Sequence, residues 1–236
     1  MKTIGIVGGV AWPSTIVYYR VINEMVARRM GGSGLHCAKI VLAQVDFDEI
    51  ERRQREGRWD LVGELLAAEG NKVKAAGADF FLVACNTVHT ADHHVEAAVD
   101  LPFLHIVDPT GRKVVDSGFG TVGLLGSKYT MRGEYFVRRL ERRYGVNVLV
   151  AVGEHADNVH NALYGELARG VLLPATRDKF RLAIEDLVAR GAEAVILGCT
   201  EFGMIVGPGD SPVPLIDTSL VHAEAAVDLA LSNEIP

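Results

Sequence analysis

An internal repeat is the feature that most constrains how this chain can fold. The stretch AAGADFFLVACNT, residues 75–87, aligns with ARGAEAVILGCTE, residues 189–201. In this alignment Cys85 matches Cys199 at an offset of 114 residues. Each stretch reads as an apolar strand that ends in cysteine and polar residues, where a core would accept Val or Leu. The repeat therefore predicts two related halves with a cysteine at the same place in each.

The rest of the chain alternates between short runs of Val, Ile and Leu and longer segments of helical period. Strands that are apolar throughout are covered on both faces, so this pattern predicts an α/β fold with parallel sheets flanked by helices. A looser match between residues 2–9 and 120–127 gives each half a glycine-rich first turn. The expected strands are residues 2–8, 37–45, 79–85, 103–107, 119–126, 147–152, 193–199 and 213–217, and the main expected helices are 14–29, 60–76, 131–144, 176–190 and 220–231.

The composition of the chain argues against several classes of protein. A hydrophobic fraction of 49% and a charged fraction of 23% are ordinary for a globular protein. The formal net charge of −6 argues against a general nucleic-acid partner. The N-terminal residues lack the pattern of a secretory signal, and no apolar run is long enough to span a membrane. Three widely spaced cysteines, Cys37, Cys85 and Cys199, argue against a disulfide framework. We therefore expect a cytoplasmic protein with reduced thiols and no membrane partner.

The two strand-end cysteines have a chemistry in common. We expect a helix to begin after each of them, with residues 86–87 and 200–201 in its first turn. Free backbone N–H groups and the helix dipole at such a turn attract an anion and favour the thiolate. Because ligands in open parallel sheets bind at the carboxyl ends of strands, two facing halves would hold a small carboxylate between two thiols.

Such a pair of thiols can invert a stereocentre without a cofactor. One thiolate would remove the α-proton from one face, while the other thiol would protonate the opposite face. The N–H groups would stabilise the developing enolate charge. A single strand-end cysteine is more often a small buried apolar residue, but the matched positions of Cys85 and Cys199 favour chemistry. Cys37 has no counterpart, and we expect it to serve packing.

The first glycine-rich turn, GIVGGVAWPST at residues 5–15, does not match two common phosphate-binding motifs. It lacks the G-x-G-x-x-G spacing of a dinucleotide site, and Pro13 stands where a P-loop needs Lys. We expect a tight strand-to-helix turn in which Gly8 and Gly9 permit close backbone approach. Pro13 suits the start of the helix, and Ser14 is expected to cap it.

Two further clusters of polar residues are predicted to lie on the exposed surface rather than in a functional site. His89 and His93 stand four residues apart, a spacing that can hold a metal. A third ligand at a recognisable spacing is missing, so we predict a polar exposed helix face and no metal site. The basic segment RRLERRYG, residues 138–145, is likewise predicted to be the exposed face of a helix.

Several motifs occur in a familiar order along nearly the whole chain. The turn GGVAWPST is followed by YYRVIN, VDFDEIERRQREGRWD, CNTVH, GLLGSKYTM, GCTE and PLIDTSLVHAEAAVD. On these motifs the sequence resembles the aspartate/glutamate racemase family, the cofactor-independent amino-acid racemases. It resembles in particular the branch whose members begin with a G-G-x-x-W-x-S-T turn.

The resemblance implies two pseudo-symmetric flavodoxin-like or Rossmann-like domains, each with a four-stranded parallel sheet, and an active site in the interdomain cleft. Residues 1–107 with 213–236 would form the first domain, which carries Cys85, and residues 108–212 the second, which carries Cys199. Family members are commonly homodimers, so the resemblance also implies a homodimer.

The resemblance further implies that Cys85 and Cys199 are an acid/base pair whose roles exchange with the handedness of the substrate. Arg52 is a candidate anchor for the substrate's side-chain carboxylate, and a solvent-exposed helix charge is an equal alternative. No metal and no cofactor are implied. The other implied substrate-binding residues are Val10, Ser14, Gln54, Asn86, Thr87, Thr200 and Glu201.

We therefore expect racemisation of an acidic amino acid. Val10, Ala11 and Pro13 stand where many relatives carry Met, Ser and Glu, which leaves the choice between aspartate, glutamate and another acidic substrate open. Alternatives are a related isomerase, a hydantoin racemase or a decarboxylase that uses the same thiols, and a non-catalytic protein that binds small carboxylates. Retention of both thiols favours the racemase, because a binding module gains nothing from an acid and a base on opposite faces.

Overall fold

The computed structural model describes residues 1–32 and 34–232 and divides the chain into two compact units. The first unit comprises Met1–Ile106 and the chain from His222 onward, and the second comprises Val107–Val221. The chain therefore passes from one unit to the other twice. The domain ranges predicted from the sequence place the second passage after residue 212, whereas in the structure it lies after Val221.

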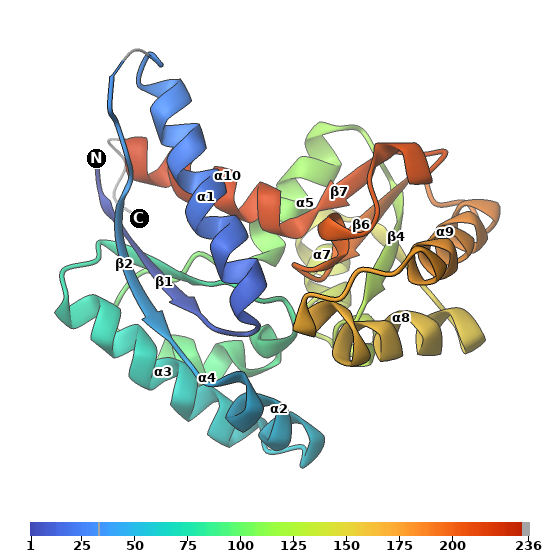
Figure 1. Cartoon of the computed structure of the whole chain (residues 1–236), viewed down its shortest axis with the longest axis horizontal. Coiled ribbons are helices and arrows are strands. Elements are labelled where there is room, and N and C mark those ends of the chain that lie inside the picture. Colours follow the sequence, from blue (N-terminus) through green and yellow to red (C-terminus); the bar gives the residue numbers. More distant parts are fainter. Residues whose placement is uncertain (33, 233–236) are drawn as a thin grey trace. The chain divides into compact units, whose positions relative to one another are not determined.

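The sheet of the first unit is parallel, with the strand order β2-β1-β3 (Figure 1). It consists of β1 (Thr3–Gly8), β2 (Lys39–Gln44) and β3 (Phe80–Val83). The expected fourth strand at residues 103–107 is wrong as a strand, because Phe103 forms only a single parallel bridge with Phe81. Helix α5 (Val107–Asp116) begins at once, with Asp108 and Pro109 in its first turn, where an acidic residue and proline are both favoured.

Helices cover both faces of this first sheet (Figure 1). On one face α1 (Trp12–Arg29) and α10 (Thr218–Leu231) pack against Ile4, Ile6 and Phe80. On the other, Val7, Phe81 and Val83 pack against the remaining helical segments of the unit. These are α2 (Phe47–Arg55), α3 (Trp59–Ala75), the 3₁₀ helix η1 (Thr87–Ala91) and α4 (Asp92–Ala98).

The second unit has a parallel sheet of four strands in the order β5-β4-β6-β7. Its strands are β4 (Thr121–Gly126), β5 (Asn147–Val150), β6 (Ala194–Gly198) and β7 (Leu215–Asp217). Since β7 pairs with β6, residues 215–217 belong to the second sheet. The helical segments are α5, α6 (Lys128–Arg132), α7 (Val137–Tyr144), α8 (Gly153–Gly165), η2 (Leu167–Arg169), α9 (Pro174–Ala189), η3 (Phe202–Met204) and η4 (Pro208–Asp210).

The two sheets have the same internal plan, so the predicted repeat and the α/β fold class are confirmed. The order β2-β1-β3 in the first corresponds to β5-β4-β6 in the second. Phe81 N–H donates to the Pro102 carbonyl, and its counterpart Val195 donates to the Pro214 carbonyl, both at 2.9 Å. The segment at Phe103 is therefore the counterpart of β7. The expectation of four strands in each sheet holds for the second and is corrected to three strands and a bridge in the first.

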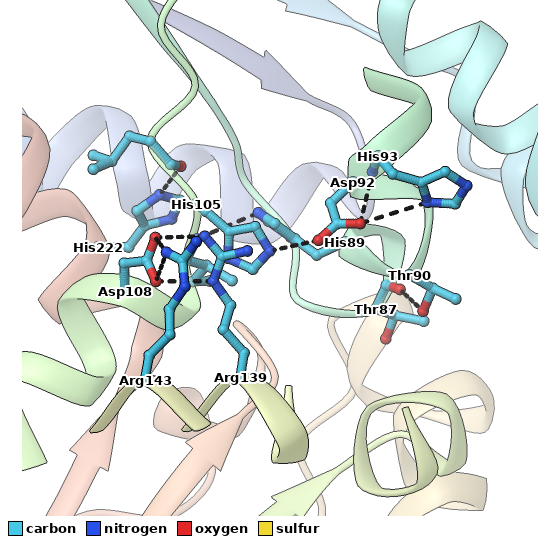
Figure 2. Close-up of polar contacts among 12 residues, drawn as sticks. Thr87, His89, Thr90, Asp92, His93, His105, Asp108, Arg139, Arg143 and His222 are labelled. Carbon is cyan, nitrogen blue, oxygen red and sulfur yellow. Dashed lines mark hydrogen bonds and ion pairs between the residues drawn. The ribbon is translucent and has the colours of Figure 1, made fainter. Parts of the chain in front are cut away.

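The basic segment at residues 138–145 is not wholly an exposed face. Arg139 donates to both carboxylate oxygens of Asp108, at 2.8 and 2.6 Å, and both side chains are mostly buried. Arg143 and the Tyr144 hydroxyl reach the same carboxylate. Figure 2 shows Arg139 and Arg143 at the Asp108 carboxylate. These contacts tie α7 to α5, and the prediction of an exposed charge is wrong for Arg139.

Within residues 1–32 and 34–232, every helix is too short or too polar to cross a membrane.

Candidate active site at the two cysteine turns

Cys85 lies just beyond the carboxyl end of β3. The strand ends at Val83, whose carbonyl accepts the Cys85 N–H at 2.8 Å, so the chain turns at this point. Cys85 is buried and packs with the same core cluster as Val10 and Val88. The sequence thus places a thiol, rather than an aliphatic side chain, where the strand leaves the sheet.

The helix that we expected after Cys85 is present, as a short 3₁₀ helix. Asn86 precedes η1, a 3₁₀ helix of only five residues, and Asn86 and Thr87 are both buried. The aligned peptide dipoles of a long helix are absent from such a short element, so they contribute little to the stability of a thiolate here. Any control of the Cys85 thiol must come from individual neighbours.

Cys199 follows β6 directly and has a defined polar partner. Its thiol Sγ donates to Glu201 Oε2 at 2.9 Å, and the Thr200 hydroxyl donates to the same oxygen at 2.9 Å. All three side chains are buried. The next element, η3, has three residues, so the expected helix is again a short 3₁₀ turn.

The two cysteine turns are matched in position but unequal in chemistry. At the offset of 114 residues, Glu201 corresponds to Thr87. A carboxyl group therefore stands two residues after Cys199, while a hydroxyl stands two residues after Cys85. Because a donor must carry its proton, Cys199 is a protonated thiol in this arrangement. Sequence reasoning treated Glu201 as a substrate ligand and missed its contact with the thiol.

The glycine-rich turn after β1 has the predicted close approach. Gly9 has a φ of +93°, and a Cβ there would overlap with the Val45 carbonyl. The Gly9 N–H donates to Thr15 Oγ1 at 2.9 Å, which closes the turn. Pro13 lies in the first turn of α1 as predicted.

Ser14 does not cap α1, so that prediction is wrong. The helix begins at Trp12 with Ala11 as its N-cap. Ser14 lies inside the first turn, fully buried, and its hydroxyl donates back to the Ala11 carbonyl at 2.8 Å. The early start follows from Pro13, whose fixed φ favours the first helical turn.

The predicted residues on α2 lie in contrasting environments. Gln54 is buried on the same side as Ile50, whereas Arg52 is exposed. The more buried arginine is Arg53, which donates to Glu49 at 2.5 Å. The structure therefore leaves the Arg52 guanidinium accessible to solvent and ligands.

Asp217 is a partly buried carboxyl group that sequence reasoning did not select. Burial raises its pKa, and hydrogen bonds from Ser219 and Leu220 act in the opposite direction. It lies so close to η3 that a Cβ on Gly203 would overlap with Asp217 Oδ2. A partly buried titratable group with a shifted pKa, at the end of a strand next to a candidate catalytic turn, is a typical functional or supporting residue. The signal available in the sequence was the motif LIDTS after a buried strand.

His89 is also misplaced by the sequence-based prediction of an exposed helix face. It is buried in η1, while His93 is exposed on α4, because the helix breaks between them. Among the residues that the structure describes, no group of three or more His, Cys, Asp or Glu side chains could hold a metal ion.

Comparisons with known proteins cover nearly the whole chain. A family model described as Asp/Glu/hydantoin racemase matches residues 7–226. The crystal structure of a candidate Asp/Glu racemase from Yersinia pestis is 40% identical with a TM-score of 0.89, and the match covers 98% of this chain and 100% of that one. The glutamate racemase of Ectopseudomonas mendocina is 31% identical over 198 residues, 81% of this chain and 70% of that protein. The broad specificity amino-acid racemase RacX of Bacillus subtilis is 24% identical over 163 residues, 69% of this chain and 70% of that protein.

Proposed function

Because the chain belongs to the Asp/Glu/hydantoin racemase family, we propose that it racemises an acidic amino acid, aspartate or glutamate, without a cofactor. The observation that carries this proposal is the matched placement of two buried thiols. Cys85 and Cys199 lie at the ends of equivalent strands of a repeated unit, each followed by buried polar residues. Similarity to racemases over nearly the whole chain supports the reaction type.

In the proposed reaction the two thiols act as acid and base on one α-carbon. The Cys85 thiolate takes the α-proton, so that the C–H bond breaks and an S–H bond forms. Cys199 gives its proton to the opposite face, so that its S–H bond breaks and the new C–H bond forms. The reverse direction exchanges the roles, which returns the protein to its starting protonation state.

Glu201 gives the second thiol a local proton acceptor. When Cys199 must act as the base from its protonated state, its proton can pass to the Glu201 carboxylate over the 2.9 Å contact, while the Cys85 thiolate takes a proton from solvent so that it can act as the acid. When Cys199 acts as the acid, the same carboxylate stabilises the protonated thiol by accepting its hydrogen bond. Cys85 has Thr87 at the corresponding position, so we propose that proton transfer at the two cysteines depends on different neighbours.

We propose that Asn86, Thr87 and Thr200 hold the α-carboxylate with the backbone N–H groups of the two turns. Hydrogen bonds to that carboxylate would lower the energy of the enolate that forms when the α-proton leaves. Val10, Ser14 and Gln54 would shape the substrate pocket, and Arg52 would pair with the side-chain carboxylate. Arg52 is exposed, so its guanidinium is available to bind a ligand.

We also propose that the protein is a cytoplasmic homodimer, on the strength of the family resemblance. Size-exclusion chromatography with light scattering tests the dimer directly, and a monomeric mass at assay concentration would reject it.

Chiral chromatography of single enantiomers of aspartate and glutamate tests the function. We expect the wild type and the exposed-thiol variant Cys37→Ser to convert either enantiomer to the racemate. Cys85→Ser and Cys199→Ser should each abolish full racemisation. Wild-type turnover in both directions by either of these two variants would reject the two-thiol mechanism.

A further inference from the structure

Lys128 stands at a position of the second unit where the first unit has an apolar residue. The match between residues 2–9 and 120–127 has an offset of 118 residues, and its next position aligns Val10 with Lys128. Val10 is buried in the core cluster that contains Cys85. The repeat therefore places a charged residue where the first unit has only apolar packing beside its thiol.

The strand registers of the two sheets support this correspondence. In the first sheet Val7 of β1 pairs with Val83 of β3, and in the second Leu125 of β4 pairs with Leu197 of β6. These pairs match each other at the same two offsets, 118 residues for the central strands and 114 for the strands that carry the cysteines. The alignment of position 10 with position 128 thus follows from the paired backbone as well as from the sequence.

The chain leaves β4 directly beside the point where it leaves β6. Gly126 and Gly198 are register partners at the last positions of the two strands, so Ser127 and Cys199 are the first residues beyond them. Neighbouring strands lie about 4.8 Å apart. Lys128 follows one residue later, as the first residue of α6. Its side chain therefore starts at the same carboxyl edge as the second thiol.

Helix α8 holds the start of α6 at this edge. The Lys128 N–H donates to His160 Nδ1 at 3.3 Å, so the hydrogen of the neutral ring is on Nε2. Burial, and then the charge of Lys128, lower the pKa of His160, which favours this neutral state. Met131 of α6 and Val159 of α8 belong to the same core cluster as Cys199. Both helices thus border the core around the second thiol.

The ammonium group of Lys128 has a ring contact and no carboxylate partner. Its Nζ lies 5.2 Å from the centroid of the Tyr129 ring, within the range at which a ring face attracts a cation. Among the residues that the structure describes, Lys128 forms no ion pair, whereas Arg177 in the same unit is paired with Asp210. The Lys128 side chain is also exposed. Its charge is therefore available to bind an anion at the carboxyl edge of the sheet.

We propose that Lys128 is a specificity-determining residue that binds the side-chain carboxylate of the substrate, an inference that rests on the proposed racemase function. Lysine binds a carboxylate as a point charge on a flexible stem, which suits a group that must reach a ligand from the edge of a sheet. A carboxylate has two oxygens, so it can accept from Lys128 as well as from Arg52. Lys128 would thereby favour an acidic over a neutral amino acid.

Substitution of Lys128 removes the charge without removing the contact that holds α6, because His160 accepts the backbone N–H of residue 128. Lys128→Met keeps an apolar stem and loses the charge, and Lys128→Arg keeps the charge. Lys179→Met on α9 is the matched control, since Lys179 is also exposed and forms no ion pair with a described residue.

Isothermal titration calorimetry of the full-length protein with succinate and glutarate measures binding without turnover. The monoamide of each probe keeps one carboxylate and replaces the other by a neutral group of similar shape. A hydrogen bond to a charged group is worth enough that Lys128→Met should raise the Kd of the dicarboxylates about tenfold or more. The Kd of the monoamides should change by less than about twofold. Lys128→Arg and Lys179→Met should stay within about threefold of the wild type with every probe.

An unchanged Kd for both dicarboxylates in Lys128→Met would overturn the proposal. Equal weakening of a dicarboxylate and its monoamide would also overturn it, because Lys128 would then bind the carboxylate that the two probes share. The same loss in Lys179→Met would reduce the effect to general surface charge and reject a specific role. Failure of the wild type to bind either dicarboxylate would reject the site as well.

Steady-state kinetics separate this inference from the proposed function. We expect the KM for the acidic substrate to rise about tenfold in Lys128→Met, while kcat changes little. If the wild type racemises no acidic amino acid while Lys128→Met selectively weakens the dicarboxylates, the proposed function is wrong and the carboxylate site stands. If the wild type racemises and Lys128→Met leaves both Kd and KM unchanged, the inference is wrong and the proposed function stands.

Discussion

The thiol of Cys199 lies 2.9 Å from the Glu201 carboxyl oxygen, and the corresponding position in the first unit holds Thr87. Two halves that repeat in backbone and in cysteine position therefore differ in the residue two positions after each cysteine. Such a difference gives proton transfer at each cysteine its own sensitivity to substitution. The predictions below use this asymmetry and the supporting contacts around it.

Glu201→Gln should impair the step in which Cys199 removes the α-proton, and because the equilibrium constant of a racemisation is one, kcat/KM should fall equally from both enantiomers. The amide oxygen can still accept a hydrogen bond from the thiol, but it cannot take up the proton. General acid–base assistance typically contributes about 10²- to 10⁴-fold, so we expect kcat/KM to fall roughly 10²-fold or more from either enantiomer. Initial rates from each single enantiomer measure this.

The matched control is Glu193→Gln at the opposite end of β6. Glu193 is exposed and accepts the Gly120 and Thr121 N–H groups at 2.7 and 2.8 Å, so it supports the strand and lies away from the thiol. Its substitution should leave both rates within about twofold. Equal losses of kcat/KM for the two variants would contradict the role assigned to Glu201.

Arg52→Gln should weaken binding of the substrate's side-chain carboxylate. A hydrogen bond to a charged group contributes about 1.5–3 kcal/mol, so KM should rise roughly tenfold or more while kcat changes little. Arg55→Gln, on the same helix, removes an exposed arginine that pairs with Glu51 at 2.9 Å and should leave KM unchanged. Steady-state kinetics with aspartate and glutamate measure these KM values. An unchanged KM in Arg52→Gln would mean that Arg52 does not bind the substrate and is an ordinary surface charge.

Gly203→Ala should destabilise the second unit, because its Cβ would overlap with the Asp217 carboxyl group. Overpacking of this kind costs about 1–3 kcal/mol of unfolding free energy. Gly209→Ala is the control, since a Cβ there meets no described atom within 4 Å. Urea denaturation should show a lower midpoint for Gly203→Ala alone. Equal midpoints would mean that Asp217 can move away without cost.

The buried histidines predict a pH dependence of stability. His222 has a pKa of about 3 in the folded protein, whereas an unfolded histidine titrates near ~6.5. Between these values the unfolded chain binds more protons, so the unfolding free energy falls as the pH falls below about 6.5, by up to about 1.4 kcal/mol per pH unit for one such group. His89, whose pKa is also held low by burial, adds to the same trend.

The double variant Tyr18→Phe/His222→Gln tests this assignment, because it removes the titrating ring and the hydroxyl that the ring accepts from. The slope of unfolding free energy against pH between about 5 and 6.5 should become smaller by close to one proton. The exposed His93→Gln should leave the slope unchanged. His105 and its partner Asp92 remain in both variants. An unchanged slope of unfolding free energy against pH in the double variant would therefore reject the low pKa of His222.

The sequence was sufficient for the repeat, the parallel α/β architecture and the two strand-end cysteines, because apolar periodicity and an internal alignment report on strands directly. Prediction from the sequence failed where one or two residues determine where a helix begins. Pro13 started α1 before Ser14, and Asp108 and Pro109 began a helix where residues 103–107 were expected to continue a strand. The 3₁₀ turns after Cys85 and Cys199 are too short to produce a hydrophobic periodicity in the sequence, so they could not be predicted either.

The contacts around the site were harder to predict because they join residues far apart in the sequence. His89 and His93 have the spacing of one helix face, yet a break between η1 and α4 buries the first and exposes the second. The approach of Asp217 to Gly203 depends on the pairing of β6 with β7, which no local pattern specifies. The bond between Cys199 and Glu201 is local, but a two-residue spacing indicates nothing until the turn conformation is known.

The most direct test of the central claim is proton NMR in D₂O with single enantiomers of aspartate and of glutamate. The account predicts that solvent deuterium replaces the α-proton while optical activity is lost, and that Cys85→Ser and Cys199→Ser each prevent full racemisation. Absence of α-exchange with every acidic amino acid would contradict the claim that these two thiols form a racemase site.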